Sequence, residues 1–104
     1  MKKKRNPIPM QDMARNARRA EALMKSLANA HRLRMLCHLV SGEQTVNELI
    51  EISNLSQSSV SQHLAKMRIE KLVGYEKRGK NVYYRITSME ARAILSTLHL
   101  IYCK

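Results

Sequence analysis

Two cysteines carry the most reactive side chains of this sequence. Cys37 and Cys103 stand far apart, and neither belongs to a Cys-x-x-Cys pair, so no zinc knuckle is predicted. Cys37 falls in an apolar helical stretch, where a thiol is most often a small buried hydrophobic group. Cys103 follows His99 by one helical turn, and the two could form half of a zinc site that Cys37 would complete. From the residues alone, three roles for the cysteines therefore stay open, namely packing in the core, thiol chemistry and zinc binding.

A run of serines and glutamines raises a second kind of chemistry. On a helical wheel, Val60, Leu64 and Met67 share an inward face, and a polar face without carboxylates lies opposite. Short hydrogen-bonding side chains at the front of a helix suit base edges in the major groove of DNA. We therefore predict that the helix 56–71 reads DNA. The residues expected to contact DNA there are Gln57, Ser58, Ser61, Gln62 and Lys66.

The charge balance favours the same partner. The 104 residues include 19 Lys and Arg against 8 Asp and Glu, which gives a net charge of +11 and a pI near 10.2. Such an excess on one small domain indicates a polyanion as partner, most often nucleic acid, and the helix 56–71 favours double-stranded DNA. A domain of this size buries a limited core by itself, so a homodimer is plausible. The alternative DNA-binding interpretation is an architectural protein without sequence preference, which would bind all duplexes alike.

Several other classes are disfavoured. No apolar run approaches the roughly 18 residues of a membrane helix. The basic residues 2–5 are followed by Asn6-Pro7-Ile8-Pro9 and not by an apolar segment, so we expect no secretion signal and a cytoplasmic location. The sequence lacks a Gly-rich phosphate loop and paired carboxylates in motif spacing, so we expect neither an enzyme nor a cofactor.

The elements that must position these residues follow from periodicity and capping. Residues 1–10 are predicted to be a flexible basic arm, and residues 11–104 one DNA-binding and dimerisation domain. A helix from Gln11 carries a small apolar seam that is typical of helix–helix packing. Its members are Met13, Ala17, Ala20, Met24 and Leu27. Asn29 is predicted to cap a second helix, and the residues Thr45 to Glu48 are predicted to form a capping box at the start of a third. Ser56 is predicted to cap the helix 56–71 that reads DNA.

A hairpin and a last helix complete the predicted fold. Two alternating segments, 73–78 and 82–86, flank Gly79-Lys80-Asn81 and predict a β-hairpin with a basic tip. Its cations, expected to meet DNA, are Lys77, Arg78, Lys80 and Arg85. A second capping box from Thr87 to Glu90 is predicted to open the last helix. The fold class is therefore mainly α with a β-hairpin wing, a winged helix-turn-helix.

Three segments of the sequence resemble a known family. Ala28–Leu36, Leu55–Leu64 and Lys71–Gly74 are similar to the ArsR/SmtB family of dimeric bacterial repressors. The resemblance implies that the first and last helices form the dimer interface and that the fourth helix reads operator DNA. Most members release DNA when a metal binds, but three of the family's metal-ligand positions hold Ile86, Ser88 and Tyr102 here, and only His99 remains. We therefore predict no metal site.

The cysteine positions resemble one branch of the family, which contains BigR, SqrR, YgaV and HlyU. The resemblance implies that Cys37 and Cys103 are a sensing pair for reactive sulfur species or oxidants. A persulfide on one cysteine would be attacked by the other, and the resulting bridge would change the affinity for the operator. Two alternatives stay open, namely an ArsR-type metal-responsive repressor and a HlyU-like activator or anti-silencer without small-molecule sensing.

Overall fold

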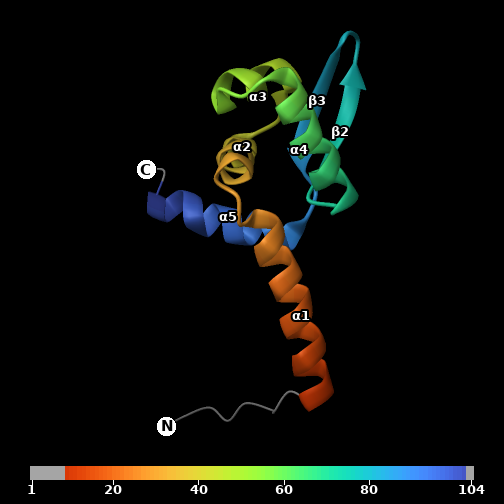
Figure 1. Ribbon diagram of the computed structural model, residues 1–104, viewed down its shortest axis with the longest axis vertical. Helices are drawn as coiled ribbons and strands as arrows, with labels where there is room; N and C mark the ends of the chain where they lie inside the picture. Colours follow the sequence, from red (N-terminus) through yellow and green to blue (C-terminus); the bar gives the residue numbers. More distant parts are fainter. Residues whose placement is uncertain (1–8, 103–104) are drawn as a thin grey trace.

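The structure is a computed structural model that describes residues 9–102, so most of the predicted N-terminal arm lies outside the described residues. Between these bounds the chain forms five helices and three strands (Figure 1). In order they are α1 (Met10–Leu27), α2 (Ala30–Ser41), β1 (Gln44–Thr45), α3 (Val46–Ser53), α4 (Gln57–Ile69), β2 (Val73–Arg78), β3 (Asn81–Ile86) and α5 (Met89–Tyr102). The predicted winged helix-turn-helix is confirmed, with α3 and α4 as the helix pair and β2–β3 as the wing.

Side-chain caps begin three of the helices where the sequence predicted them. The Asn29 side chain accepts a hydrogen bond from the Arg32 amide at 3.1 Å. Thr45 and Glu48 form the reciprocal capping box of α3, with bonds of 3.1 and 2.7 Å. Ser56 caps α4 by accepting from the Ser59 amide at 3.2 Å. Each bond satisfies an amide that the first helical turn leaves without a backbone partner.

The predicted capping box at the start of α5 is wrong by one residue. The hydroxyl of Ser88, not Thr87, accepts the hydrogen bond from the Ala91 amide, at 3.0 Å. Thr87 is held elsewhere, because its amide donates to the Leu72 carbonyl at 2.9 Å and its hydroxyl to the Lys71 carbonyl at 3.4 Å. Smaller shifts occur at α1, which begins at Met10, and at α4, which spans Gln57–Ile69 instead of residues 56–71.

The sheet is antiparallel in the order β1-β3-β2. Arg78 pairs with Asn81, so the hairpin turn consists of the two residues Gly79 and Lys80. Gly79 has φ 61°, in the left-handed region that a two-residue hairpin turn requires and that glycine adopts freely. The short strand β1 was not predicted, and it attaches the chain between α2 and α3 to the wing.

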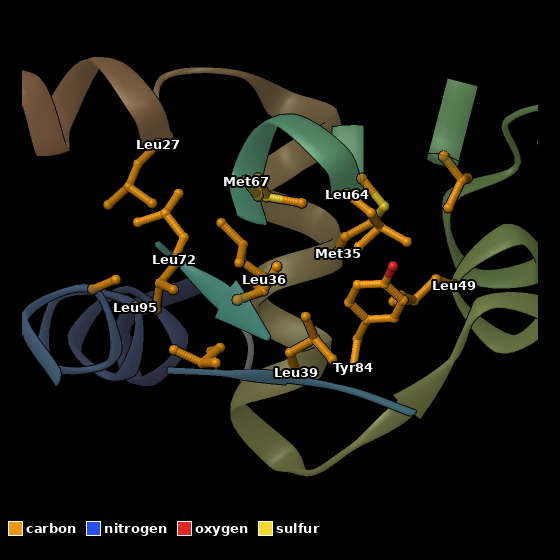
Figure 2. Packing of buried hydrophobic residues seen from close by; sticks show 14 residues of the cluster. Leu27, Met35, Leu36, Leu39, Leu49, Leu64, Met67, Leu72, Tyr84 and Leu95 are labelled. Carbon is orange, nitrogen blue, oxygen red and sulfur yellow. The ribbon is translucent and has the colours of Figure 1, made fainter. Parts of the chain in front are cut away.

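The core lies where α2 meets α3, α4, the sheet and α5 (Figure 2). Met35, Leu36 and Leu39 of α2 are at most 1% exposed and form its centre. The predicted inward face of α4, which consists of Val60, Leu64 and Met67, is buried against them. Burial of one such side chain contributes roughly 1.5–3 kcal/mol, so this contact fixes the orientation of α4.

Helix α1 extends away from the rest of the molecule (Figure 1). Leu27 is buried at its C-terminal end, whereas Met13 and Met24 of the predicted seam are 55% and 54% exposed. The apolar seam is therefore uncovered within a single chain. Among the described residues, no helix combines the length and the apolar character needed to cross a membrane.

Candidate nucleic-acid interface and cysteine-lined cavity

The exposed face of α4 gathers the polar side chains that the sequence singled out. Gln57, Ser58, Ser61, Gln62 and Lys66 are all exposed, opposite the buried face of the helix. No acidic residue occupies the first turn, so the helix N-terminus keeps its attraction for phosphate. The five side chains predicted to contact DNA are therefore all exposed on one helix.

Some side chains of this face already make hydrogen bonds within the chain, and others do not. The Ser58 hydroxyl lies 3.3 Å from that of Ser56, within the cap of the helix. Among the described residues, no hydrogen bond uses the side chains of Gln57, Ser61 or Gln62. These three side chains can therefore meet an external partner without breaking a contact inside the chain.

A basic cluster that the sequence did not reveal lies beside α4. Arg32 of α2 is buried and donates to the Ser26 carbonyl at 3.0 Å and to Glu70 at 3.4 Å, just after α4. The rings of His31 and His63 lie 6.3 Å apart between centroids. Burial lowers the pKa of His63, and the positive charges of Arg32, His31 and Lys66 lower it further. Both effects favour the neutral form of His63 over its charged form.

The strand register places the four predicted wing cations on different surfaces. Directly paired residues of antiparallel strands share a face. Lys77 pairs with Val82 and thus lies on the face of the sheet that carries the buried Tyr84 and Ile86, towards the core. Arg78 and Arg85 belong to the opposite, outer face, and Lys80 lies in the turn. The four cations are therefore divided between the two faces of the sheet and the turn.

The two arginines of the outer face are bound to carboxylates. Arg78 Nη2 lies 2.8 and 3.1 Å from the carboxylate oxygens of Glu43 and 2.7 Å from Glu76 Oε1. Arg85 Nη1 lies 3.4 Å from Glu76 and 3.9 Å from Glu43. The hydrogen bond from Arg78 and the charge of its guanidinium lower the pKa of Glu76, with a smaller contribution from Arg85. Neither carboxylate was predicted from the sequence, although the spacing of Glu76 and Arg78 by two positions on one strand places them on the same face.

Cys37 lies at the edge of a cavity between α2 and α5. The thiol side chain is half-buried and lines an apolar space of about 400 Å³. The other lining residues are Ala30, Leu33, Arg34, His38, Leu98 and Tyr102. Cys103 lies outside the described residues, but it follows Tyr102 directly in the sequence. The structure therefore brings Cys37 to the end of α5 that leads into the second cysteine.

Among residues 9–102, no group of three or more His, Cys, Asp or Glu side chains could hold a metal ion. The zinc site considered from the sequence depends on Cys103, outside these residues.

Residues 29–75 match the family described as bacterial regulatory protein, arsR family. The transcriptional activator HlyU of Vibrio cholerae is 41% identical over 98 residues, which cover 94% of this chain and 91% of that protein. The chain belongs to the ArsR family. The structure of reduced HlyU from Vibrio cholerae has a TM-score of 0.87 and covers 91% of this chain and 100% of that one. The structure of the repressor BigR from Xylella fastidiosa is 31% identical, with a TM-score of 0.81. It covers 93% of this chain and 99% of that one.

Membership of the ArsR family decides the general activity. This ArsR-family chain is a DNA-binding transcriptional regulator and not an enzyme. Binding to operator DNA and assembly as a homodimer are typical of the family. The resemblance to the branch that contains HlyU and BigR is confirmed.

Proposed function

We propose that this protein is a homodimeric regulator whose affinity for operator DNA is switched by a bridge between Cys37 and Cys103. A persulfide or another oxidant is the proposed signal. The observation that carries the proposal is the shared cavity: Cys37 on α2 forms one wall, and Tyr102, the residue before Cys103, forms another. The similar structure of HlyU from Vibrio cholerae is that of a reduced form, which is consistent with a relative that has more than one redox state.

In the proposed complex, the reading helix α4 enters the major groove. Gln57, Ser61 and Gln62 offer donors and acceptors to base edges, and Ser58 can add a hydroxyl from the first turn. Lys66 would contact a phosphate and so position the helix without reading sequence.

The wing extends the proposed contact to the neighbouring DNA backbone. Lys77 and Lys80 are exposed, and no ion pair among the described residues involves either of them. Arg78 and Arg85 would join the contact only by exchanging a carboxylate for a phosphate oxygen.

The proposed dimer forms through α1 and α5. The seam of α1 exposes Met13 and Met24, and the last turns of α5 expose Leu100, Ile101 and Tyr102 at 70%, 59% and 78%. Exposed apolar residues on these two helices indicate a surface that another protein covers. A second copy would set two reading helices at the spacing of operator half-sites, about 34 Å or one helical turn of DNA.

The proposed switch begins with transfer of sulfur to one cysteine. A sulfane-sulfur donor gives its outer sulfur to the thiolate of Cys37 and leaves as a thiol. The Cys103 thiolate then attacks the inner sulfur of this persulfide, which forms a disulfide and releases hydrosulfide. A bridge that retains extra sulfur atoms spans a longer distance than a plain disulfide, whose Cα atoms must lie within about 7 Å. Either bridge would tie α2 to α5, the helix of the proposed dimer interface.

Intact-protein mass and DNA binding, measured on the same samples, test the switch. The protein is treated with glutathione persulfide or with hydrogen peroxide, and its affinity is measured for a duplex that it selects from a random library. We expect peptide mapping to join Cys37 to Cys103 and the affinity to fall by the 5- to 150-fold that is the usual allosteric range of about 1–3 kcal/mol. The variants Cys37→Ser and Cys103→Ser should keep their affinity under both treatments. Release of DNA by either variant would refute the bridge, and the DNA-binding function would stand.

The relationship to HlyU favours a second candidate for the direction of regulation. HlyU is a transcriptional activator, and its identity to this chain is 41%. A HlyU-like role as an activator or anti-silencer needs DNA binding but no cysteine bridge. A promoter fusion with the selected duplex separates the two, because a repressor lowers transcription from a bare promoter. An anti-silencer raises transcription only when a silencing protein already occupies the DNA.

A further inference from the structure

Helix α1 meets the rest of the described chain near its C-terminal end (Figure 1). Leu27 is buried there, and residues 10–26 are exposed or half-buried. An open cleft of about 1360 Å³ lies beside the helix, and its lining includes Leu23 of α1, Lys71 just after α4 and Ser88 just before α5. Packing therefore does little to set the direction in which α1 leaves the core.

Arg32 of α2 supplies a polar connection at this point. Its side chain is buried, and its Nη1 atom donates to the Ser26 carbonyl, in the last turn of α1, at 3.0 Å. The same nitrogen lies 3.4 Å from Oε1 of Glu70, the residue that caps the C-terminal end of α4. The last carbonyls of a helix have no partner within the helix, so the Ser26 carbonyl can accept this bond. One nitrogen of a rigid, planar guanidinium therefore joins the ends of α1 and α4.

Stability does not account for a guanidinium at this position. The Nε atom of Arg32 is buried, and no hydrogen-bond partner for it lies within residues 9–102. A buried donor without a partner destabilises a fold. Moreover, apolar side chains of similar volume often replace a buried ion pair without loss of stability. A buried charged group that costs stability can instead fix one arrangement of the elements around it, and here those elements are α1 and α4.

We infer that Arg32 is a positioning residue that fixes the angle between α1 and the reading helix α4, and thereby the separation of the two reading helices in the dimer. The inference rests on the proposed dimer, in which α1 contacts the second copy. A helix of 18 residues is about 27 Å long, so a rotation of about 10° at Ser26 displaces its far end by roughly 5 Å. Successive base pairs lie about 3.4 Å apart along the duplex, so this displacement exceeds one base-pair step.

The expected consequence concerns the spacing of the operator half-sites. A duplex with one base pair inserted or deleted between its half-sites presents them at a different distance and rotation. While Arg32 holds α1 against α4, the dimer resists this change, and its binding should weaken. Without the connection, α1 can turn relative to α4, and each reading helix can follow its own half-site. Loss of Arg32 should therefore reduce the preference for one spacing.

The double variant Arg32→Met with Glu70→Gln is the most informative, because it breaks the connection and leaves no unpaired charge in the core. Arg34→Met is its matched control, since Arg34 is an exposed arginine of the same helix that lines the cavity between α2 and α5. Fluorescence anisotropy under reducing conditions gives the affinity of each full-length protein for the selected duplex and for versions with one base pair inserted or deleted between the half-sites. Coupling between sites typically amounts to 5- to 150-fold, so the preference for the selected spacing should fall by at least about fivefold in the double variant. Arg34→Met should keep the preference of the parent.

Arg32→Lys provides a second test in case the double variant fails to fold or to dimerise, which urea denaturation and sedimentation of each protein show. Lysine keeps the charge beside Glu70 but lacks the planar fork of arginine, so the spacing preference should fall by a smaller factor. If the folded, dimeric variants at position 32 keep the preference of the parent, Arg32 does not position α1, and the proposed dimer stands. If the parent binds a single half-site as tightly as the paired half-sites, the proposed dimeric binding and this inference both fail.

Discussion

Replacing Gln62 by alanine tests whether α4 reads bases, and the structure allows its effect to be estimated. Gln62 is exposed, and no hydrogen bond among the described residues uses its side chain. Its removal should therefore leave the free energy of unfolding within about 0.5 kcal/mol of the parent. A bidentate contact from glutamine to adenine contributes about 1–3 kcal/mol of discrimination. Because a dimer makes the contact twice, binding to the selected duplex should weaken by at least about 2 kcal/mol, or roughly 30-fold.

Lys66→Gln provides the comparison for a backbone contact one helical turn away. Loss of a phosphate contact should weaken binding to every duplex alike and reduce the salt slope by about 1 per subunit. Anisotropy titrations against the selected duplex, against its single-base variants and against a random duplex distinguish the two patterns. Gln62→Ala should lose its preference at one base pair in each half-site. If it instead weakens binding to all duplexes equally and keeps every base preference, Gln62 does not read bases and the proposed docking of α4 is wrong.

Three further predictions concern the scaffold and can be checked by urea denaturation. Leu64→Ala removes a side chain that is 1% exposed beneath the reading helix and should destabilise the fold by about 2–5 kcal/mol. Glu70→Gln leaves the buried Arg32 guanidinium without its counter-charge and should destabilise the fold by about 1–3 kcal/mol. The double variant Arg32→Met with Glu70→Gln should recover most of that loss, because it leaves no unpaired charge in the core. Because the pKa of His63 is lowered in the folded state, protons bind more readily to the unfolded chain. The free energy of unfolding should then fall as the pH drops below about 6.5, and it should level off once the pH lies below the pKa of His63 in the folded state. His63→Gln should flatten this pH dependence.

Local signals in the sequence predicted the helix starts and the buried face of α4, because these features depend on residues a few positions apart. Asn29, Thr45 and Ser56 cap the helices that they precede. At α5 the same local rule failed, since Thr87 makes its hydrogen bonds to residues 71 and 72, which directly precede the first strand of the hairpin. A capping motif cannot reveal that its first residue is already hydrogen-bonded to residues that lie far away in the sequence.

The surfaces of the wing depend on contacts that no local pattern contains. Glu43 precedes Arg78 by 35 positions in the sequence, and the two meet only because β1 pairs with β3. Strand β1 itself has two residues, too few to show the alternation that predicts a strand. The sequence therefore revealed the positive charges of the wing but not the carboxylates that compensate them.

Helix α2 connects the cysteine-lined cavity to the reading helix, and this connection is the physical basis of the proposed switch. One side of α2 carries Cys37 towards α5, and another buries Met35 and Leu36 against the inward residues of α4. Interiors of proteins are close-packed, so a shift of α2 that follows a bridge to α5 cannot be absorbed by empty space in the core. It must move α4, or move α5 and with it the proposed dimer partner. Either movement changes the distance or the angle between two reading helices that have to match half-sites about 34 Å apart. A bridge at Cys37 therefore has no need to touch the DNA-binding surface in order to weaken binding.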